Sequence, residues 1–189
     1  MIKKLKINSS VYSVLKDKIN NNSFPWYEGH TPTDYSPNIT FLYHEVVTRD
    51  GHVNSFLYDD CKKLLDDLTK QLVIPLNKIL RCCVNFTYNQ PVKNCDFHVD
   101  HDFPHKSCIV YLNTLDHAAT HICEEKYEKG QQVALPASSI NFIKYQSILP
   151  EEQTFIYFDQ AVLFDGLQYH ANEYPDCGKQ RKVIVYTFT

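Results

Sequence analysis

The stretch DFHVDHDFPHKSCIVYLN, residues 96–113, contains two short runs with the composition of β-strands, 96–101 and 107–113. Valine, isoleucine and aromatic residues favour strands, and Pro104 separates the two runs. Similar runs lie on both sides of it: ITFLYHEVV at 39–47, RCCVNFTY at 81–88, THICEE at 120–125, INFIKY at 140–145, TFIYFD at 154–159, AVLF at 161–164 and KVIVYTF at 182–188. Many short strands at regular spacing indicate a β-sandwich or barrel. Residues 124–139 lack a clear pattern and are predicted to form a long loop, of the kind that often covers a functional site.

Two helices are predicted in the mixed flank at residues 1–79. The first covers about 9–20. The second is amphipathic, because apolar residues recur at three- and four-residue intervals; they are Leu57, Cys61, Leu64, Leu65, Leu68 and Leu72. Ser55 is a candidate N-cap for this helix, and Pro75 is expected to end or bend it. Packed on the outside of the strands at 80–189, these helices would cover one sheet of a mainly β fold.

The composition is that of one ordinary globular domain. A chain of 189 residues can bury a core without disulfides, and an aromatic content of 13% suits a β-rich fold. The net charge of −3 provides no positive field for nucleic acid or an anionic membrane. No apolar run is long enough to span a bilayer, and the start MIKKLKINSS lacks the features of a secretory signal.

The seven cysteines indicate a reducing compartment. Their number is odd, no two form a CxxC pair, and several lie in apolar runs such as KSCIVYL at 106–112. A free thiol in such a run behaves as a small apolar side chain. We therefore predict free cysteines and a cytoplasmic location.

The residues FHVD, at 97–100, form a candidate metal-binding pair. Successive side chains of a strand point to opposite faces, so His98 and Asp100 would project together. A third ligand must come from elsewhere, and LFDGLQYHAN at 163–172 offers His170. Two histidines and one carboxylate on one side of an ion leave three positions open, an arrangement typical of non-haem Fe(II) oxygenases that activate dioxygen.

An HxD pattern also occurs by chance in a chain with nine histidines. The other histidines of this half of the chain are expected to be surface or loop residues: His101, His105, His117 and His121. His101 should point away from His98 if the strand stays regular.

Arg181 strengthens the metal-site hypothesis. It opens the last strand, eleven residues after His170, where it could bind the far carboxylate of a dicarboxylic cosubstrate through two parallel hydrogen bonds. The chain has only three arginines, the others being Arg49 and Arg81. Lysine is much commoner in this chain, so the retention of an arginine at this position suggests a specific role. Alternatively, Arg181 is an exposed charge at a strand edge; Lys182 beside it should face the opposite way.

Together these motifs resemble those of the iron(II)/2-oxoglutarate-dependent dioxygenases, within them the small prolyl-4-hydroxylase-like branch that includes phage and viral proteins. The resemblance covers roughly 81–188. It rests on HVD at 98–100, YLN at 111–113, FDGLQYH ending at His170, and Arg181. FPWYE at 24–28 is similar to an N-terminal signature of phage members.

The resemblance implies one 2-oxoglutarate/Fe(II) oxygenase domain over 1–189, with a jelly-roll core, or double-stranded β-helix, at 80–189. The three residues of the predicted metal site would be the iron ligands. Arg181 would bind the distal carboxylate of 2-oxoglutarate. Four side chains are candidates to assist Arg181 in binding the cosubstrate: Tyr111, Tyr88, Asn113 and Asn85. For the two tyrosines, ordinary packing in the core is the alternative.

The resemblance also implies hydroxylation of a peptidyl residue of prolyl type, or of a small amino-acid-like metabolite, with release of succinate and CO2. The presence of Asp100 argues against the halogenating branch, which has a small residue there. Two positions depart from the family pattern. Val183 stands where many relatives have Ser or Thr, and Ala118-Ala119 where some have Gly-Gly.

Two other functions remain open. One is a zinc hydrolase or isomerase on a cupin-like barrel, since His and Asp also suit zinc; it would need no cosubstrate cation, so Arg181 argues against it. The other is a non-catalytic jelly-roll binding module. Nucleic acid is not expected as a partner, because nucleobase-demethylating relatives usually carry a second arginine six residues after the first, where this chain has Thr187.

Overall fold

A computed structural model describes residues 2–30, 39–128, 130–138, 144–159 and 167–189. The predicted strand at 161–164, and most of the one at 140–145, lie outside these residues. The helices are α1 (Val11–Asn20) and α2 (Tyr58–Leu72). The strands are β1 (Ile2–Lys6), β2 (Tyr27–His30), β3 (Thr40–Val47), β4 (Ile79–Tyr88), β5 (Phe97–His98), β6 (Lys106–Tyr111), β7 (Thr120–Tyr127), β8 (Ala134–Leu135), β9 (Tyr145–Ile148), β10 (Thr154–Asp159), β11 (Leu167–Asn172) and β12 (Gln180–Phe188).

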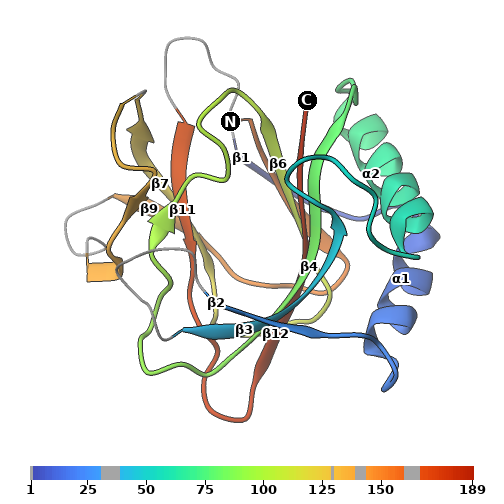
Figure 1. The fold of residues 1–189 in the computed structure, drawn as a ribbon, viewed down its shortest axis with the longest axis horizontal. Helices are drawn as coiled ribbons and strands as arrows, with labels where there is room; N and C mark the ends of the chain where they lie inside the picture. Colours follow the sequence, from blue (N-terminus) through green and yellow to red (C-terminus); the bar gives the residue numbers. More distant parts are fainter. Residues whose placement is uncertain (1, 31–38, 129, 139–143, 160–166) are drawn as a thin grey trace.

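The strands form two antiparallel sheets. The larger has seven strands in the order β1-β10-β6-β12-β4-β3-β2, and the smaller has five in the order β8-β5-β11-β7-β9. Figure 1 shows α1 and α2 side by side against the outer face of the large sheet, with the small sheet on the other side of the molecule. The prediction of a mainly β fold with helices covering one sheet is confirmed.

Alternation along β6 shows how the large sheet is buried on both faces. Cys108 and Val110 belong to the core cluster that contains the buried leucines of α2. Ile109 and Tyr111 point the other way, into a cluster that includes Ile122 from the small sheet. A strand buried on both faces has an unbroken apolar sequence, which explains why residues 107–112 contain so little polar character.

The amphipathic helix α2 confirms the predicted apolar spacing, but its ends differ from the prediction. Its N-cap is Leu57 rather than Ser55, whose hydroxyl oxygen instead accepts a hydrogen bond from the Leu57 backbone N–H in the turn before the helix. The helix ends at Leu72, before Pro75, because Val73 turns into the left-handed region with φ 58°. A backbone turn, and not the proline, therefore ends the helix.

Replacing Val73 with glycine is expected to raise the free energy of unfolding by about 1 kcal/mol, because a left-handed conformation is costly for a β-branched residue and not for glycine. The Val73 side chain is 89% exposed, so little packing is lost. Urea denaturation measures the change. Val14→Gly, at a half-exposed position inside α1, is the matched control and should lower stability by about 0.5 kcal/mol. A Val73→Gly protein less stable than the wild type would contradict the expected strain.

The flank at 1–79 contributes strands to the large sheet as well as helices. β1 pairs with β10, and β3 pairs with β4. The segment 124–139 is not the patternless loop that the sequence predicts, since β7 continues to Tyr127 and β8 pairs with β5. A two-residue strand such as β8 is too short for a detectable sequence period, and only the exposed edge of β5 makes it a strand.

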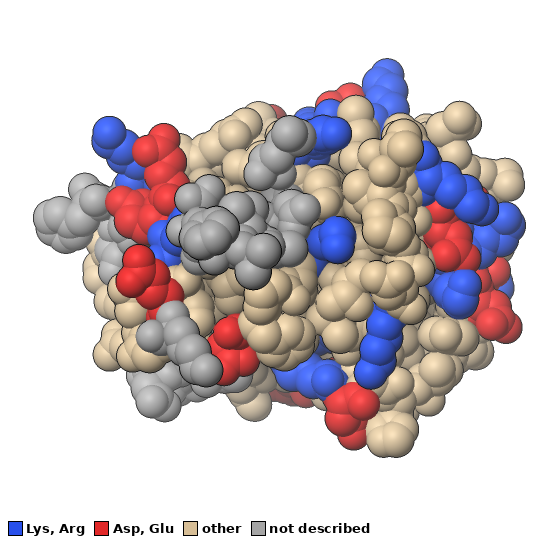
Figure 2. Space-filling view, turned by 90° about the horizontal axis from the view of Figure 1, so that it is seen from above, with Lys and Arg blue, Asp and Glu red and all other residues tan. Residues whose placement is uncertain are grey.

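The cysteines are free thiols, six of them buried and Cys177 exposed. Neither helix that the structure describes combines the length and apolarity needed to cross a membrane. On the face drawn in Figure 2, the described acidic and basic side chains are interspersed, so neither sign forms a continuous surface there.

Candidate metal centre

His98 and His170 lie opposite each other on neighbouring strands of the small sheet. β5 and β11 are antiparallel, and these two residues are register partners, with their rings 4.6 Å apart. The pairing of β11 with β7 shifts register between Gln168 and His170. Such bulges re-aim a side chain and are common beside functional sites. The two imidazoles are therefore placed together by strand pairing.

Asp100 reaches the same point from a bend rather than from a strand. The predicted strand at 96–101 is wrong in extent, because β5 covers only Phe97–His98 and the chain turns at Asp100. Phe97 and Val99 pack together in an apolar cluster, as the predicted alternation requires. Ligand atoms of His98, Asp100 and His170 lie within 4.8 Å of one another. His170 Nε2 is 3.4 Å from Asp100 Oδ2.

These three side chains fit a divalent metal ion. Asp100 Oδ2 is buried and accepts no hydrogen bond from any group that the structure describes. His98 Nδ1 lies 3.0 Å from the Asp96 carbonyl oxygen, so it carries the proton and leaves Nε2 as a ligand. Neighbouring ligand atoms around an ion with bonds of about 2.1 Å are roughly 3 Å apart. The 3.4 Å between His170 Nε2 and Asp100 Oδ2 is close to that spacing.

Electrostatics keep Asp100 ionised. Burial alone would raise the pKa of this carboxyl group, but His170, His98 and Arg81 together lower the pKa well below its usual value. An ionised carboxylate is the form that binds a metal ion.

Arg181 is a buried cation at another side of the same pocket. Its side chain is only 3% exposed. Nε donates to the Ala118 carbonyl oxygen at 3.1 Å, and Nη2 donates to Thr120 Oγ1 at 2.8 Å. No carboxylate among the described residues forms an ion pair with it, and burial lowers its pKa. A buried charge without a counter-ion is costly, so the site is built for an anion.

Ala118, whose carbonyl oxygen accepts a hydrogen bond from Arg181, is the position at which the family resemblance leads one to expect glycine. It adopts a left-handed conformation with φ 61°, the kind that glycine favours. With Ala118-Ala119 in place of Gly-Gly, the sequence alone suggests a different turn. The backbone at Ala118 nevertheless keeps the conformation that glycine would adopt. That turn presents the carbonyl oxygen that accepts from Arg181.

The four assisting candidates are placed differently from one another. Tyr111 is fully buried beneath Arg181, and its hydroxyl is 2.9 Å from Thr120 Oγ1. Asn85 lines the pocket. Tyr88 and Asn113 are outside its lining: the Tyr88 hydroxyl contacts the Thr40 hydroxyl at 2.7 Å. The Asn113 amide bonds the backbone of β12 at Gln180 and Lys182, so its polar groups tie strands together.

The remaining histidines correct one expectation. His121 is a buried residue of β7, so the expectation of a surface or loop position is wrong for it. His105 is a buried loop residue, and His117 is half-buried beside Asp116. His101 lies at the pocket, 2.7 Å from Thr187 Oγ1, where burial lowers its pKa to about 4. A loop that folds back onto the core, as at His105, buries a side chain that no sequence periodicity marks.

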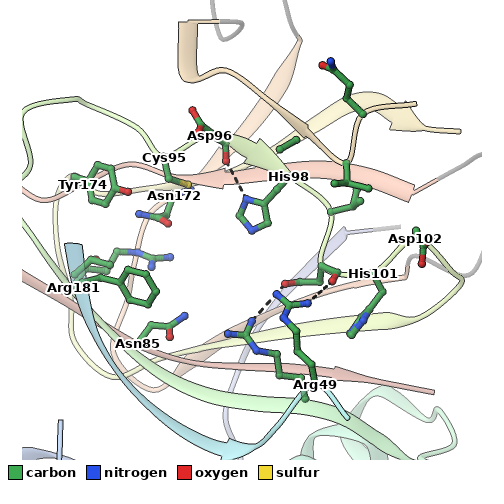
Figure 3. Close-up of a pocket in the computed structure, with 18 of the residues that line it drawn as sticks. Arg49, Asn85, Cys95, Asp96, His98, His101, Asp102, Asn172, Tyr174 and Arg181 are labelled. Atoms are coloured by element: carbon green, nitrogen blue, oxygen red, sulfur yellow. Dashed lines mark hydrogen bonds and ion pairs between the residues drawn. The ribbon is translucent and has the colours of Figure 1, made fainter. Parts of the chain in front are cut away.

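The pocket has a volume of about 960 Å³ and is lined by His98, Asp100 and Arg181. Arg49 and Arg81 also line it, so all three arginines of the chain line one pocket. Figure 3 shows the His98 ring pointing into the pocket, with Arg181 on one side and Arg49 on the other. Sequence reasoning assigned no site role to Arg49 and Arg81, although the scarcity of arginine was a usable signal.

No family model matches the sequence, and no curated protein matches it. Solved structures do. An oxidoreductase of the 2OG-Fe(II) oxygenase family from Burkholderia pseudomallei is similar with a TM-score of 0.68 and 13% identity, over 100% of this chain and 84% of that one. The epimerase SnoN, in complex with Fe3+, alpha ketoglutarate and nogalamycin RO, is similar with a TM-score of 0.64 and 9% identity, over 100% and 78%.

A prolyl hydroxylase from Trichoplax adhaerens, in complex with a hypoxia inducible factor peptide fragment, is similar with a TM-score of 0.61 and 12% identity, over 99% of this chain and 83% of that one. The fold of this chain is therefore the jelly roll, or double-stranded β-helix. It is in particular the fold of the 2OG-Fe(II) oxygenases, as the sequence predicts.

Proposed function

We propose that this protein is an Fe(II)- and 2-oxoglutarate-dependent dioxygenase. His98, Asp100 and His170 would bind the ferrous ion. Arg181 would bind the distal carboxylate of 2-oxoglutarate. The observation that carries the proposal is a His-Asp-His cluster, in which Asp100 and His170 are buried, beside a pocket that also contains a buried arginine without a described counter-ion.

The three ligands leave half of an octahedral coordination sphere open. When bound, ferrous ion with 2-oxoglutarate supplies the oxidising chemistry: one oxygen atom of O2 enters the organic substrate and the other enters succinate, with release of CO2. The chain's own residues provide geometry and exclusion of water. The apolar cluster of Ile109, Ile122 and Val183 closes the space between the two sheets.

Arg181 is held in place before any ligand arrives. Its hydrogen bonds to Ala118 and Thr120, and its position over the Tyr111 ring at 5.8 Å, restrict the guanidinium group. A preorganised fork loses little entropy when it binds a carboxylate. Tyr111 supports this arrangement through its contact with the Thr120 hydroxyl.

The substrate we propose is a peptidyl residue of prolyl type or a small amino-acid-like metabolite, oxidised by hydroxylation. One similar structure contains a peptide fragment, which supports the first alternative, and another contains nogalamycin RO, a small molecule in a protein of this fold. The volume of the pocket is sufficient for either.

Anaerobic addition of Fe(II) and 2-oxoglutarate to the purified protein tests the proposal. A weak visible charge-transfer absorption is expected, because the keto acid would chelate the ferrous ion directly. Zn(II) in place of Fe(II) is the control and should give no band. A zinc hydrolase or a metal-free binding module would show no band with either metal, and that result would reject the proposed function.

A further inference from the structure

Arg49 and Arg81 form a second cationic group in the pocket, apart from Arg181. Arg49 follows β3, is exposed at the pocket, and donates through Nη1 to the Asp100 carbonyl oxygen at 2.7 Å. Arg81 lies in β4 and places Nη1 3.8 Å from Asp100 Oδ1. Both guanidinium groups therefore lie beside the same residue of the metal centre.

The two cationic groups mark different ends of the pocket. Arg181 is the register partner of Thr87, and Arg81 is the register partner of Thr187. Six residues along β12 correspond to roughly 20 Å of strand. Figure 3 agrees, because Arg181 and Arg49 approach from different sides of the pocket into which His98 points. A ligand of Arg49 and Arg81 is thus distinct from the cosubstrate carboxylate at Arg181.

The Arg81 guanidinium has unused hydrogen-bonding capacity. Its Nε is buried and has no hydrogen-bond partner among the described groups. The 3.8 Å separation from Asp100 is an ion pair too long for a hydrogen bond. Alternation along β4 turns Arg81, Asn85 and Thr87 to the pocket, while Cys82 and Val84 face the helices.

Asp100 and Glu45 act on the charge of Arg49, and Asp96 and Asp102 also line the pocket. Partial burial and the neighbouring Arg81 lower the pKa of Arg49, whereas Asp100 and Glu45 act in the opposite direction. If the metal ion is bound, the charge of Asp100 is committed to it. Asp100 would then be less available to neutralise Arg81, whose Nη1 lies 3.8 Å from it.

We propose that Arg49 and Arg81 bind a carboxylate group of the substrate. This proposal rests on the proposed function, because it assumes that the substrate occupies the pocket beside the metal ion. The planar fork of arginine matches a carboxylate, and the buried Nε of Arg81 has no described hydrogen-bond partner. The substrate class is therefore a carboxylate-bearing molecule, such as a free amino-acid-like acid, rather than an uncharged residue inside a peptide.

The presence of three arginines allows a direct test by nuclear magnetic resonance, since the Nε–H region of the protein contains three arginine signals. The Zn(II)-substituted protein, which is diamagnetic, is first saturated with 2-oxoglutarate. Acetate is then titrated as the carboxylate probe, with acetamide as the neutral control and methyl phosphate as the dianionic control. The Arg49 and Arg81 signals should shift saturably with acetate alone, while the Arg181 signal stays where 2-oxoglutarate placed it.

Variants assign the signals and test the roles. Arg81→Gln should weaken acetate binding about tenfold, equivalent to ~1.4 kcal/mol, and the double variant with Arg49→Gln should abolish it. Lys78→Gln, at an exposed cation outside this pocket, should leave acetate binding unchanged. Thermal melting confirms that each variant is folded.

The outcomes are distinguishable. Arg49 and Arg81 signals that do not move, or that move equally with acetamide, would show that the pair only positions Asp100 and would overturn the carboxylate site. A stronger response to methyl phosphate would reject the carboxylate in favour of a phosphate. Failure of 2-oxoglutarate to move the Arg181 signal would count against the proposed function instead.

Discussion

Replacing Asp100 with alanine is expected to abolish 2-oxoglutarate turnover and to weaken ferrous binding more than about 100-fold. Loss of groups that merely orient a ligand costs 10- to 100-fold in metal affinity, so loss of a ligand should cost more. Asp100 is also the anionic member of the proposed triad, and without it two neutral imidazoles remain. Metal affinity is measured by competition with a chelating dye, and turnover by succinate release without added substrate.

Asp116→Ala is the control for this prediction, because the Asp116 side chain is 93% exposed and lies outside the pocket. It should retain wild-type metal affinity. His98→Ala and His170→Ala should repeat the loss seen with Asp100→Ala. Full succinate formation in all three variants would remove these residues from the mechanism.

Replacing Arg181 with glutamine is expected to weaken 2-oxoglutarate binding about 30-fold or more. Removal of one partner of a buried charge pair costs ~2–5 kcal/mol. The rate at saturating 2-oxoglutarate should fall much less, because in the proposed role Arg181 binds the far end of the cosubstrate and touches no reacting atom. Cosubstrate affinity is measured by the concentration dependence of the charge-transfer band.

Lys182→Gln is the matched control on the same strand. Its Nζ donates to Asn20 Oδ1 and lies over the Phe86 ring, on the opposite face of β12 from Arg181. Arg181→Lys should give an intermediate affinity, since it keeps the charge and loses the planar fork. An unchanged 2-oxoglutarate affinity in folded Arg181→Gln protein would reject the cosubstrate role.

The candidate metal centre shows how much of a site a local sequence pattern can predict. Alternation along a strand explains why Phe97 and Val99 pack away from His98. It does not explain Asp100, which lies beyond the end of β5 and turns toward the histidines in a bend. The HxD pattern thus predicted correctly that His98 and Asp100 lie close together. It predicted wrongly that both belong to one regular strand.

The sequence by itself determined the element types over most of the chain, because the apolar period of α2 and the unbroken apolar runs of β6 and β12 reflect local propensity and burial. Only the tertiary structure decided which distant residues meet. The register of β5 with β11 brings His170 opposite His98, and the pairing of β4 with β12 brings Arg81 into the pocket. Strand register depends on contacts between segments far apart in the chain, and no local period encodes them.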